Sequence, residues 1–269
     1  MYDNFNRNIN YLRISVTDRC NLRCRYCMPE EGVRLLSHNQ ILSFEEITEV
    51  VKVAVSLGVS KVRITAGEPL VRHDVVRLVE QISAINGIKD LSMTTNGILL
   101  SKYAIALREA GLQRVNVSLD TLNPSHFEYL TRGGNIQDVI RGIDAALDAG
   151  LKPLKLNCVV KESSNDEDSQ SVREFAKSRN IQVRFIQQMS LSTGHFSIVE
   201  GGSGGDCAHC NRLRLTANGK IKPCLFNDQE FDVRELGVAE ALKRAVDNKP
   251  ACGSYNYTGE FYRRISNLS

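Results

Sequence analysis

Three cysteines close together in the sequence have the greatest capacity for chemistry. Cys20, Cys24 and Cys27 form a C-x3-C-x2-C group directly after a predicted strand. Thiolates this close on one loop can hold three irons of a [4Fe–4S] cluster and leave the fourth iron open. A zinc knuckle is the alternative, but a structural zinc site normally closes with a fourth Cys or His, and none lies near this loop. The spacing therefore predicts an iron–sulfur cluster with one open iron.

A second group of cysteines follows far downstream. Cys207, Cys210 and Cys224 have a C-x2-C-x13-C spacing, which is less specific than the first. His209 or Cys252 could complete a zinc site. Because the first group already predicts an iron–sulfur cluster, a second [4Fe–4S] cluster is the better interpretation of this group. If Cys252 is a ligand, this cluster is closed and serves electron transfer; if it is not, one iron is open to a substrate.

The composition fits a soluble, metal-binding chain. Eight cysteines in 269 residues without an apolar leader favour metal or redox chemistry over disulfides, and Cys158 alone is expected to be a buried core thiol. No apolar run approaches the roughly 18 residues of a membrane span. A net charge of +3 is too mild for nucleic acid but compatible with a basic pocket for a phosphorylated ligand. We therefore expect a cytoplasmic protein.

Short β-rich runs alternate with helical patterns along the first part of the chain. The clearest helix follows a capping-box pattern at Ser43–Glu46, and a similar helix is expected over Asn135–Ala149. The expected strands are Leu12–Thr17, Lys61–Thr65, Leu91–Thr95, Arg114–Leu119, Lys155–Val160 and Gln182–Gln187. This alternation predicts parallel βαβ units, in an open or partial barrel or a doubly wound sheet.

Polar and glycine residues gather where these strands end. The first cysteine group, Ala66–Pro69, Thr94–Gly97 and Ser118–Asp120 each follow or end a predicted strand. The carboxyl ends of parallel strands share one edge of a sheet, and ligands bind there. The sequence therefore places a site on this rim.

The pattern changes after Met189. Gly201–Gly205 is expected to be a flexible link. Leu213–Thr216 and Lys220–Phe226 flank Ala-Asn-Gly and predict a hairpin, and a last helix is expected over Val233–Val246. We therefore divide the chain into a barrel domain, residues 1–190, and a small C-terminal domain, residues 191–269.

The first cysteine group resembles that of the radical S-adenosylmethionine (radical SAM) enzymes. In that family the open iron chelates the methionyl amine and carboxylate, and reduction cleaves the sulfonium to a 5′-deoxyadenosyl radical. Ala66-Gly-Glu-Pro69 resembles the family's G-G-E-P segment. The resemblance assigns cofactor binding to Tyr26, Gly67, Glu68, Thr95, Asn96 and Ser118.

The chain resembles most closely the GTP 3′,8-cyclases of molybdenum cofactor biosynthesis. The segments Tyr11–Cys20, Lys61–Leu70, Asn116–Asp120 and Cys207–Lys220 carry this likeness. It implies a partial (β/α)6 TIM-like barrel, and a small C-terminal domain whose second [4Fe–4S] cluster binds the guanine base. It also implies GTP as substrate, S-adenosylmethionine as cofactor and an electron donor, and allows a homodimer.

The family's GTP-binding positions carry cations in this chain. They are Arg13, Lys61, Arg63, Lys155, Arg184, Arg212 and Arg214. Most lie within predicted strands, where Lys61-Val-Arg63-Ile alternates charged with apolar residues. Buried cations are rare without partners, so this alternation predicts an inward basic lining for a triphosphate, which arginine can bind in a bidentate manner. The alternative for any one of them is a solvated charge.

The chain departs from the family pattern at three points. Ala66 replaces the family's first glycine, the segment between Met189 and Cys207 is short, and the chain ends Ile-Ser-Asn-Leu-Ser269 in place of Gly-Gly. Because that glycine tail is associated with turnover, two alternatives stay open. One is a radical SAM enzyme with two clusters that acts on another nucleotide or a peptide; the other is a non-catalytic, nucleotide-binding iron–sulfur protein.

Overall fold

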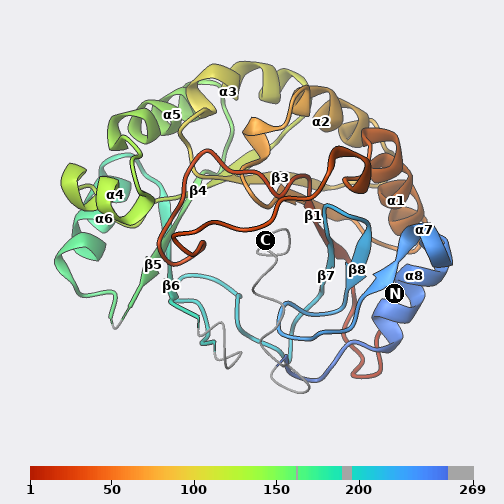
Figure 1. Cartoon of the computed structure of the whole chain (residues 1–269). Helices are drawn as coiled ribbons and strands as arrows, with labels where there is room; N and C mark the ends of the chain where they lie inside the picture. Colours follow the sequence, from red (N-terminus) through yellow and green to blue (C-terminus); the bar gives the residue numbers. More distant parts are fainter. Residues whose placement is uncertain (162, 190–195, 254–269) are drawn as a thin grey trace.

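The chain forms one curved sheet with helices on its outer face (Figure 1). The computed structural model describes residues 1–161, 163–189 and 196–253. The strands are β1 (Tyr11–Ser15), β2 (Lys61–Thr65), β3 (Asp90–Thr95), β4 (Arg114–Ser118), β5 (Lys155–Val160), β6 (Gln182–Gln187), β7 (Arg212–Leu215), β8 (Lys220–Lys222) and β9 (Phe231–Asp232). The six strands predicted between Leu12 and Gln187 are confirmed to within two residues at each end, whereas β8 ends four residues before the predicted Phe226.

Each of the first five strands is followed by one or more α-helices, as the alternation predicts. The α-helices are α1 (Phe44–Ser56), α2 (Val75–Ser83), α3 (Leu100–Glu109), α4 (Pro124–Thr131), α5 (Ile136–Asp148), α6 (Glu167–Ser178), α7 (Val233–Leu236) and α8 (Val238–Asp247). The helix predicted over Val233–Val246 is divided at Gly237, whose φ is +76°. Helices α1 to α6 follow the convex side of the sheet in Figure 1.

The sheet has the order β6-β5-β4-β3-β2-β1-β7-β8-β9. The pairs from β6 to β7 are parallel, and the pairs β7–β8 and β8–β9 are antiparallel. The predicted hairpin is therefore present as β7 and β8, but it extends the barrel sheet beside β1. The architecture is an open, partial barrel, and the division of the chain at residue 190 stays a prediction.

The strands alternate between the helical layer and the concave face. Leu12 and Ile14 of β1 are fully buried beneath the helices, whereas Tyr11 and Arg13 face the other side, because successive strand residues point to opposite faces. Cys158 of β5 is fully buried, so the prediction of a core thiol is confirmed. The apolar core thus occupies the convex side and leaves the concave face to polar residues.

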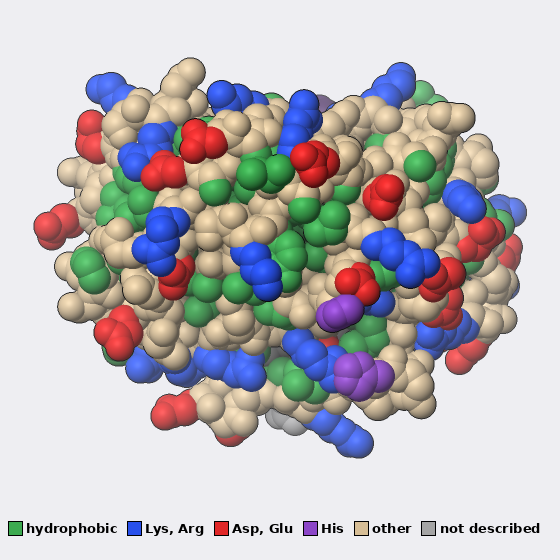
Figure 2. Space-filling view, turned by 90° about the horizontal axis from the view of Figure 1, so that it is seen from above, with side chains coloured by type: hydrophobic (Ala, Val, Ile, Leu, Met, Phe, Trp, Pro, Cys, Tyr) green, Lys and Arg blue, Asp and Glu red, His purple; other side chains and the backbone are tan. Residues whose placement is uncertain are grey.

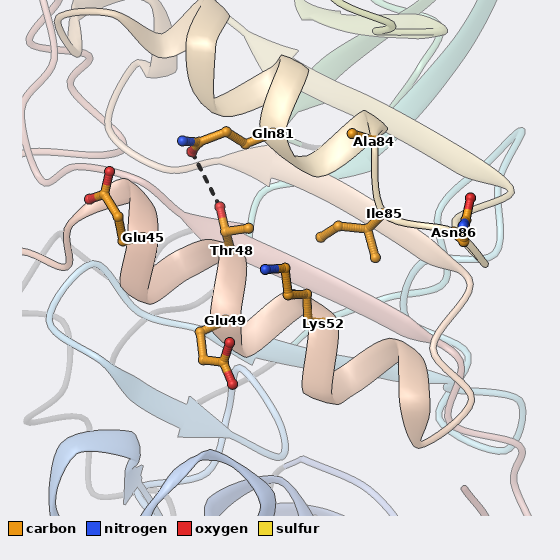
Figure 3. Close-up of a pocket in the computed structure, with 8 residues that line it drawn as sticks. All are labelled: Glu45, Thr48, Glu49, Lys52, Gln81, Ala84, Ile85 and Asn86. Atoms are coloured by element: carbon orange, nitrogen blue, oxygen red, sulfur yellow. Dashed lines mark hydrogen bonds between the residues drawn. The ribbon is translucent and has the colours of Figure 1, made fainter.

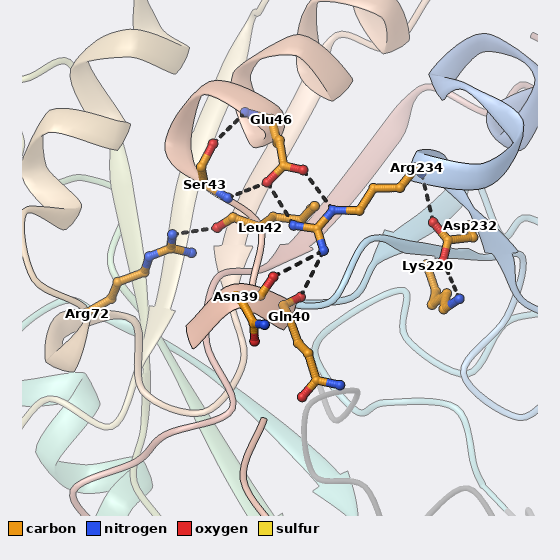
Figure 4. Close-up of polar contacts among 9 residues, drawn as sticks. All are labelled: Asn39, Gln40, Leu42, Ser43, Glu46, Arg72, Lys220, Asp232 and Arg234. Atoms are coloured by element: carbon orange, nitrogen blue, oxygen red, sulfur yellow. Dashed lines mark hydrogen bonds and ion pairs between the residues drawn. The ribbon is translucent and has the colours of Figure 1, made fainter. Parts of the chain in front are cut away.

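The capping box of α1 also anchors the C-terminal part of the chain (Figure 4). Ser43 Oγ accepts from Glu46 N at 3.1 Å, and Ser43 N donates to Glu46 Oε2 at 2.7 Å. Arg234, at the start of α7, donates to both carboxylate oxygens of Glu46, at 2.7 and 3.0 Å. A helix cap and a bidentate ion pair therefore share one carboxylate.

The Gly201–Gly205 segment is not a flexible link. Val199 N donates to Gly204 O at 2.8 Å, and Glu200 forms a bridge with Phe185 of β6. A Cβ at Gly205 would lie 2.1 Å from Ser197 O, so a side chain could not fit there. The prediction failed because these glycines permit a close backbone approach rather than free motion. The end of the chain, Ile-Ser-Asn-Leu-Ser269, lies outside the described residues.

The surface in Figure 2 shows Lys and Arg side chains interspersed with Asp and Glu. This face therefore has no patch of a single sign of charge. In the described part of the chain, no helix is long and apolar enough to cross a membrane.

Candidate functional site

The first cysteine group lies on a loop that is tied to the end of α4. Arg23 N donates to Thr131 O at 3.1 Å. Arg132 donates to Arg23 O and to Met28 O at 2.8 and 2.9 Å, so one guanidinium holds both ends of the loop that carries Cys24 and Cys27. The family resemblance did not include Arg132, which follows α4 in a left-handed conformation with φ +57°.

The three thiols of this loop face one another. A hydrogen bond between Cys24 and Cys27 lowers the pKa of Cys24 and raises that of Cys27. Burial raises the pKa of Cys20 to about 11, and Asn96 Nδ2 lies 3.8 Å from its sulfur. In the described residues, no three Cys, His, Asp or Glu side chains are gathered tightly enough to hold a single metal ion. The three predicted ligands are nevertheless close enough on this loop to influence one another's pKa.

Beside this loop, Glu68 is buried in a fixed orientation. One carboxylate oxygen accepts from Thr95 Oγ1 at 2.7 Å and Leu70 N at 3.0 Å, and the other accepts from Asn96 N at 2.7 Å. Burial raises the pKa of Glu68 to about 7. These bonds join the end of β2 to the end of β3, as predicted from their shared rim.

The glycine before Glu68 meets the cysteine loop directly. A Cβ at Gly67 would lie 2.2 Å from Arg19 O, and its φ is +50°. Ala66, where the family has a glycine, also has a positive φ of +67°, a left-handed conformation that costs a residue with a Cβ about 1–2 kcal/mol. The chain therefore has a strained backbone at Ala66, next to the glycine that meets the loop.

Tyr26 points to the carboxylate of Asp120, a residue that the sequence placed on the rim but not among the cofactor-binding residues. Its hydroxyl donates to Asp120 Oδ2 at 2.6 Å, and Asp120 Oδ1 accepts from Val159 N at 2.8 Å. Burial raises the pKa of Asp120. Ser118 ends β4 and pairs with Asn157 of β5 in register. Asp120 therefore fixes the ring of Tyr26 next to the cysteine loop.

The predicted cations form two rows across the concave face of the sheet. The register places Tyr11 of β1 between Lys61 of β2 and Arg212 of β7. Two residues along, Arg13 lies between Arg63 and Arg214 in the same way. The continuation of the sheet from β1 to β7 thus brings together cations that are about 200 residues apart in the sequence.

Within residues 1–161, 163–189 and 196–253, no carboxylate forms an ion pair with Arg13 or Arg214. Burial, then the charge of Arg214, lowers the pKa of Arg13; burial, then the charge of Arg212, lowers that of Arg214 to about 10. Three buried donors here have no hydrogen-bond partner in the described structure: Arg13 Nε, Arg214 Nη1 and Arg184 Nε. Buried donors normally find partners, so this face is built for an anion.

The cations and the second cysteine group line one cavity of ≈ 480 Å³. This volume is within the range of about 300–1,000 Å³ that small-molecule sites occupy. The predicted residues on its wall are Arg13, Lys61, Arg63, Arg184, Cys207, Cys210, Arg212, Arg214 and Cys224. Lys155 is not part of this wall, although it starts the neighbouring strand β5. Arg114 is on the wall and was missed; its guanidinium is paired with Asp90, with Nε–Oδ1 at 2.9 Å.

The second cysteine group lies next to these cations. Lys249 and Arg212 more than offset the effect of burial and lower the pKa of Cys210 to about 7. Lys249 is itself buried and donates to Arg212 O at 2.8 Å and Pro223 O at 2.6 Å. Lys249 was missed because nothing in its local sequence distinguishes it from a solvated lysine. Its charge favours a thiolate, the form that binds metals.

A second hollow lies on the outer helical layer, between α1 and α2 (Figure 3). Its wall includes Glu45, Lys52 and Gln81, and Thr48 Oγ1 lies 3.3 Å from Gln81 Oε1. It contains none of the predicted site residues, and it is on the opposite side of the sheet from the cations. The basic cavity is therefore the better candidate site.

Two family models match overlapping parts of this chain. A family model described as the radical SAM superfamily matches residues 14–176, and one described as Molybdenum Cofactor Synthesis C matches residues 159–251. The GTP 3′,8-cyclase of Thermodesulfovibrio yellowstonii is 44% identical, with 88% of each chain covered. That of Moorella thermoacetica is 43% identical, over 93% of this chain and 94% of the relative.

Solved structures with lower identity share the fold. The complex of Streptococcus suis SuiB with the precursor peptide SuiA has a TM-score of 0.67 at 17% identity and covers 90% of this chain and 65% of that one. Native anSMEcpe with bound AdoMet has a TM-score of 0.67 at 14% identity, over 95% of this chain and 88% of that one. The open barrel seen here is therefore an established architecture.

Proposed function

We propose that this chain, which belongs to the radical SAM superfamily and to the GTP 3′,8-cyclases within it, converts GTP to 3′,8-cyclo-7,8-dihydro-GTP for molybdenum cofactor biosynthesis. The observation that carries the proposal is the row of Arg63, Arg13 and Arg214 in a cavity that also contains Cys207, Cys210 and Cys224. Arg13 Nε and Arg214 Nη1 in this row are buried donors without a partner in the described structure. Such a row requires a polyanion, and the adjacent thiols supply metal ligands.

At the first site, Cys20, Cys24 and Cys27 would hold the [4Fe–4S] cluster that superfamily membership implies. When bound, this cluster and S-adenosylmethionine supply the radical that removes hydrogen from the ribose, so that the C3′–C8 bond can form. Glu68 is oriented by its three hydrogen bonds and is suited to accept from the methionyl ammonium. Asp120 holds the Tyr26 ring and limits its motion beside the cofactor.

At the second site, the arginine row would bind the triphosphate. Arg13 and Arg214 have donors free for phosphate oxygens in the described structure, and Tyr11 OH is a further unpartnered group beside them. Bidentate contacts would fix the position of the nucleotide as well as bind it. Water would be displaced from the buried guanidiniums, which strengthens their attraction for phosphate.

Cys207, Cys210 and Cys224 would hold a second [4Fe–4S] cluster next to the base. The reaction needs an electron from outside to begin, so we also propose a cytoplasmic electron donor. The two-domain division and a homodimer remain predictions of the sequence.

The test is an anaerobic assay with reconstituted protein, S-adenosylmethionine, dithionite and GTP, followed by mass spectrometry. We expect GTP-dependent 5′-deoxyadenosine and a product isomeric with GTP, and neither from the Cys24→Ala variant. Equal 5′-deoxyadenosine without GTP, and no isomer, would indicate a different substrate. GTP binding without any cleavage of S-adenosylmethionine would indicate a non-catalytic protein.

A further inference from the structure

A fourth cysteine lies against the second cysteine group. A hydrogen bond joins the side chains of Cys252 and Cys207, and Gly253 N donates to the Cys207 sulfur. A Cβ at Gly253 would lie 2.7 Å from Cys224 Sγ. The segment that follows α8 therefore runs between two of the three predicted cluster ligands and places its own thiol beside one of them.

Buried cations hold this segment in place. Arg7 Nη1 donates to Cys207 O at 2.7 Å and to Ala251 O at 3.2 Å, and Nη2 donates to Pro250 O at 2.7 Å. Its Nε is paired with the buried carboxylate of Asp3 at 2.6 Å. One guanidinium thus ties the backbone before Cys252 to the backbone of Cys207.

Lys249 fixes the same segment from its other end. Its ammonium bonds Arg212 O and Pro223 O and contacts the thiol of Cys210. It is 3% exposed, so the bonds are sheltered from water. Because buried charged groups hold Lys249, Pro250 and Ala251, the position of Cys252 is set by the fold and not by its own thiol contact alone.

We propose that Cys252 supplies a fourth thiolate to the C-terminal cluster and closes it in the absence of substrate. This inference rests on the second cluster of the proposed function. The Cys252 thiol would lose its proton to solvent and its sulfur would replace a water ligand at the fourth iron, with no electron transferred. Binding of the guanine base at that iron would then require displacement of Cys252, so this cysteine competes with the substrate.

The test isolates the second cluster in the Cys20→Ala/Cys24→Ala/Cys27→Ala background of the full chain. A cluster with four cysteine ligands resists loss of iron under mild ferricyanide oxidation, whereas an open one releases its fourth iron and gives a [3Fe–4S] EPR signal. We expect the background protein to retain about four irons per chain. Addition of Cys252→Ala should convert most of the cluster to the three-iron form under the same treatment, and Cys252→Ser should give partial conversion.

The matched control is Cys158→Ala, which removes a buried thiol of the core and should behave like the background protein. Equal conversion of the background and Cys252→Ala proteins would overturn the role of Cys252 while leaving the second cluster in place. Failure of the background to bind any iron, or binding of zinc instead, would overturn the second cluster as well, so the two failures are distinguishable.

Discussion

Arg13 lies between two other guanidiniums on the concave face of the sheet, and its Nε is buried. Arg63 and Arg214 are its neighbours in register, and its Nε has no partner in the described structure. Repulsion among these guanidiniums lowers the stability of the ligand-free protein. The same arrangement leaves a preformed site for an anion. The same residue should therefore have opposite effects on stability and on binding.

We predict that Arg13→Met raises the free energy of unfolding without nucleotide and weakens GTP binding. Removal of an unsatisfied buried polar group should stabilise the free protein by about 1–3 kcal/mol. Loss of a charged hydrogen bond should cost about 1.5–3 kcal/mol of binding free energy. Urea denaturation and calorimetric titration with GTP measure the two quantities. The control is Arg244→Met on the exposed side of α8; a less stable Arg13→Met protein would contradict the argument.

A second residue-scale prediction concerns Glu68. Glu68→Gln keeps the shape of the side chain but replaces one acceptor oxygen with a donor that faces N–H or O–H groups of Leu70, Thr95 or Asn96. We expect S-adenosylmethionine binding to weaken by at least about tenfold, or 1.4 kcal/mol, with unchanged iron content of the first cluster. Equilibrium dialysis and iron analysis measure these, with exposed Glu45→Gln as control. Loss of iron together with binding would instead indicate collapse of the loop.

At the scale of elements, Arg7 links the N-terminal segment to the stretch that follows α8. Arg7→Met removes the bonds to Cys207 O, Pro250 O and Ala251 O and leaves the carboxylate of Asp3 buried without its cation. Breaking a buried pair from one side costs about 3–5 kcal/mol. We expect a loss of this size in urea denaturation, against no more than about 0.5 kcal/mol for Arg244→Met. A small loss would mean that Asp3 finds another partner.

Elements set by local pattern could be predicted, and those set by distant pairing could not. The capping box of Ser43 and the strand over Lys61–Thr65 follow from short-range periodicity, and both are confirmed. The pairing of β7 with β1 has no local signal, because a parallel partner is not joined by a tight turn. The family resemblance assigned the cations to the site, but it did not predict the rows that they form across β1, β2 and β7. The positions of Arg7 and Lys249 also became known only from the structure.

At the scale of the whole molecule, one continuous sheet carries both cysteine groups. Strand β1 pairs with β2 (Lys61–Thr65) on one side and with β7 (Arg212–Leu215) on the other, and α8 packs against α1. Separation of the C-terminal part would therefore expose the edge of β1 and the side of α1. A sheet edge and an apolar helix face are both costly to expose, so the two parts should not unfold independently.

We therefore predict a single cooperative unfolding transition for the cluster-free protein. Backbone amides of Leu12 in β1, Ile64 in β2 and Leu213 in β7 should share one opening free energy in native-state hydrogen exchange. Far-UV circular dichroism and tyrosine fluorescence should give coincident urea curves. The comparison that decides is between β7 and β2: protection of Ile64 that outlasts that of Leu213 by several kcal/mol would show that the C-terminal part opens first. The domain division at residue 190 would then describe a real unfolding unit and not only a change in sequence pattern.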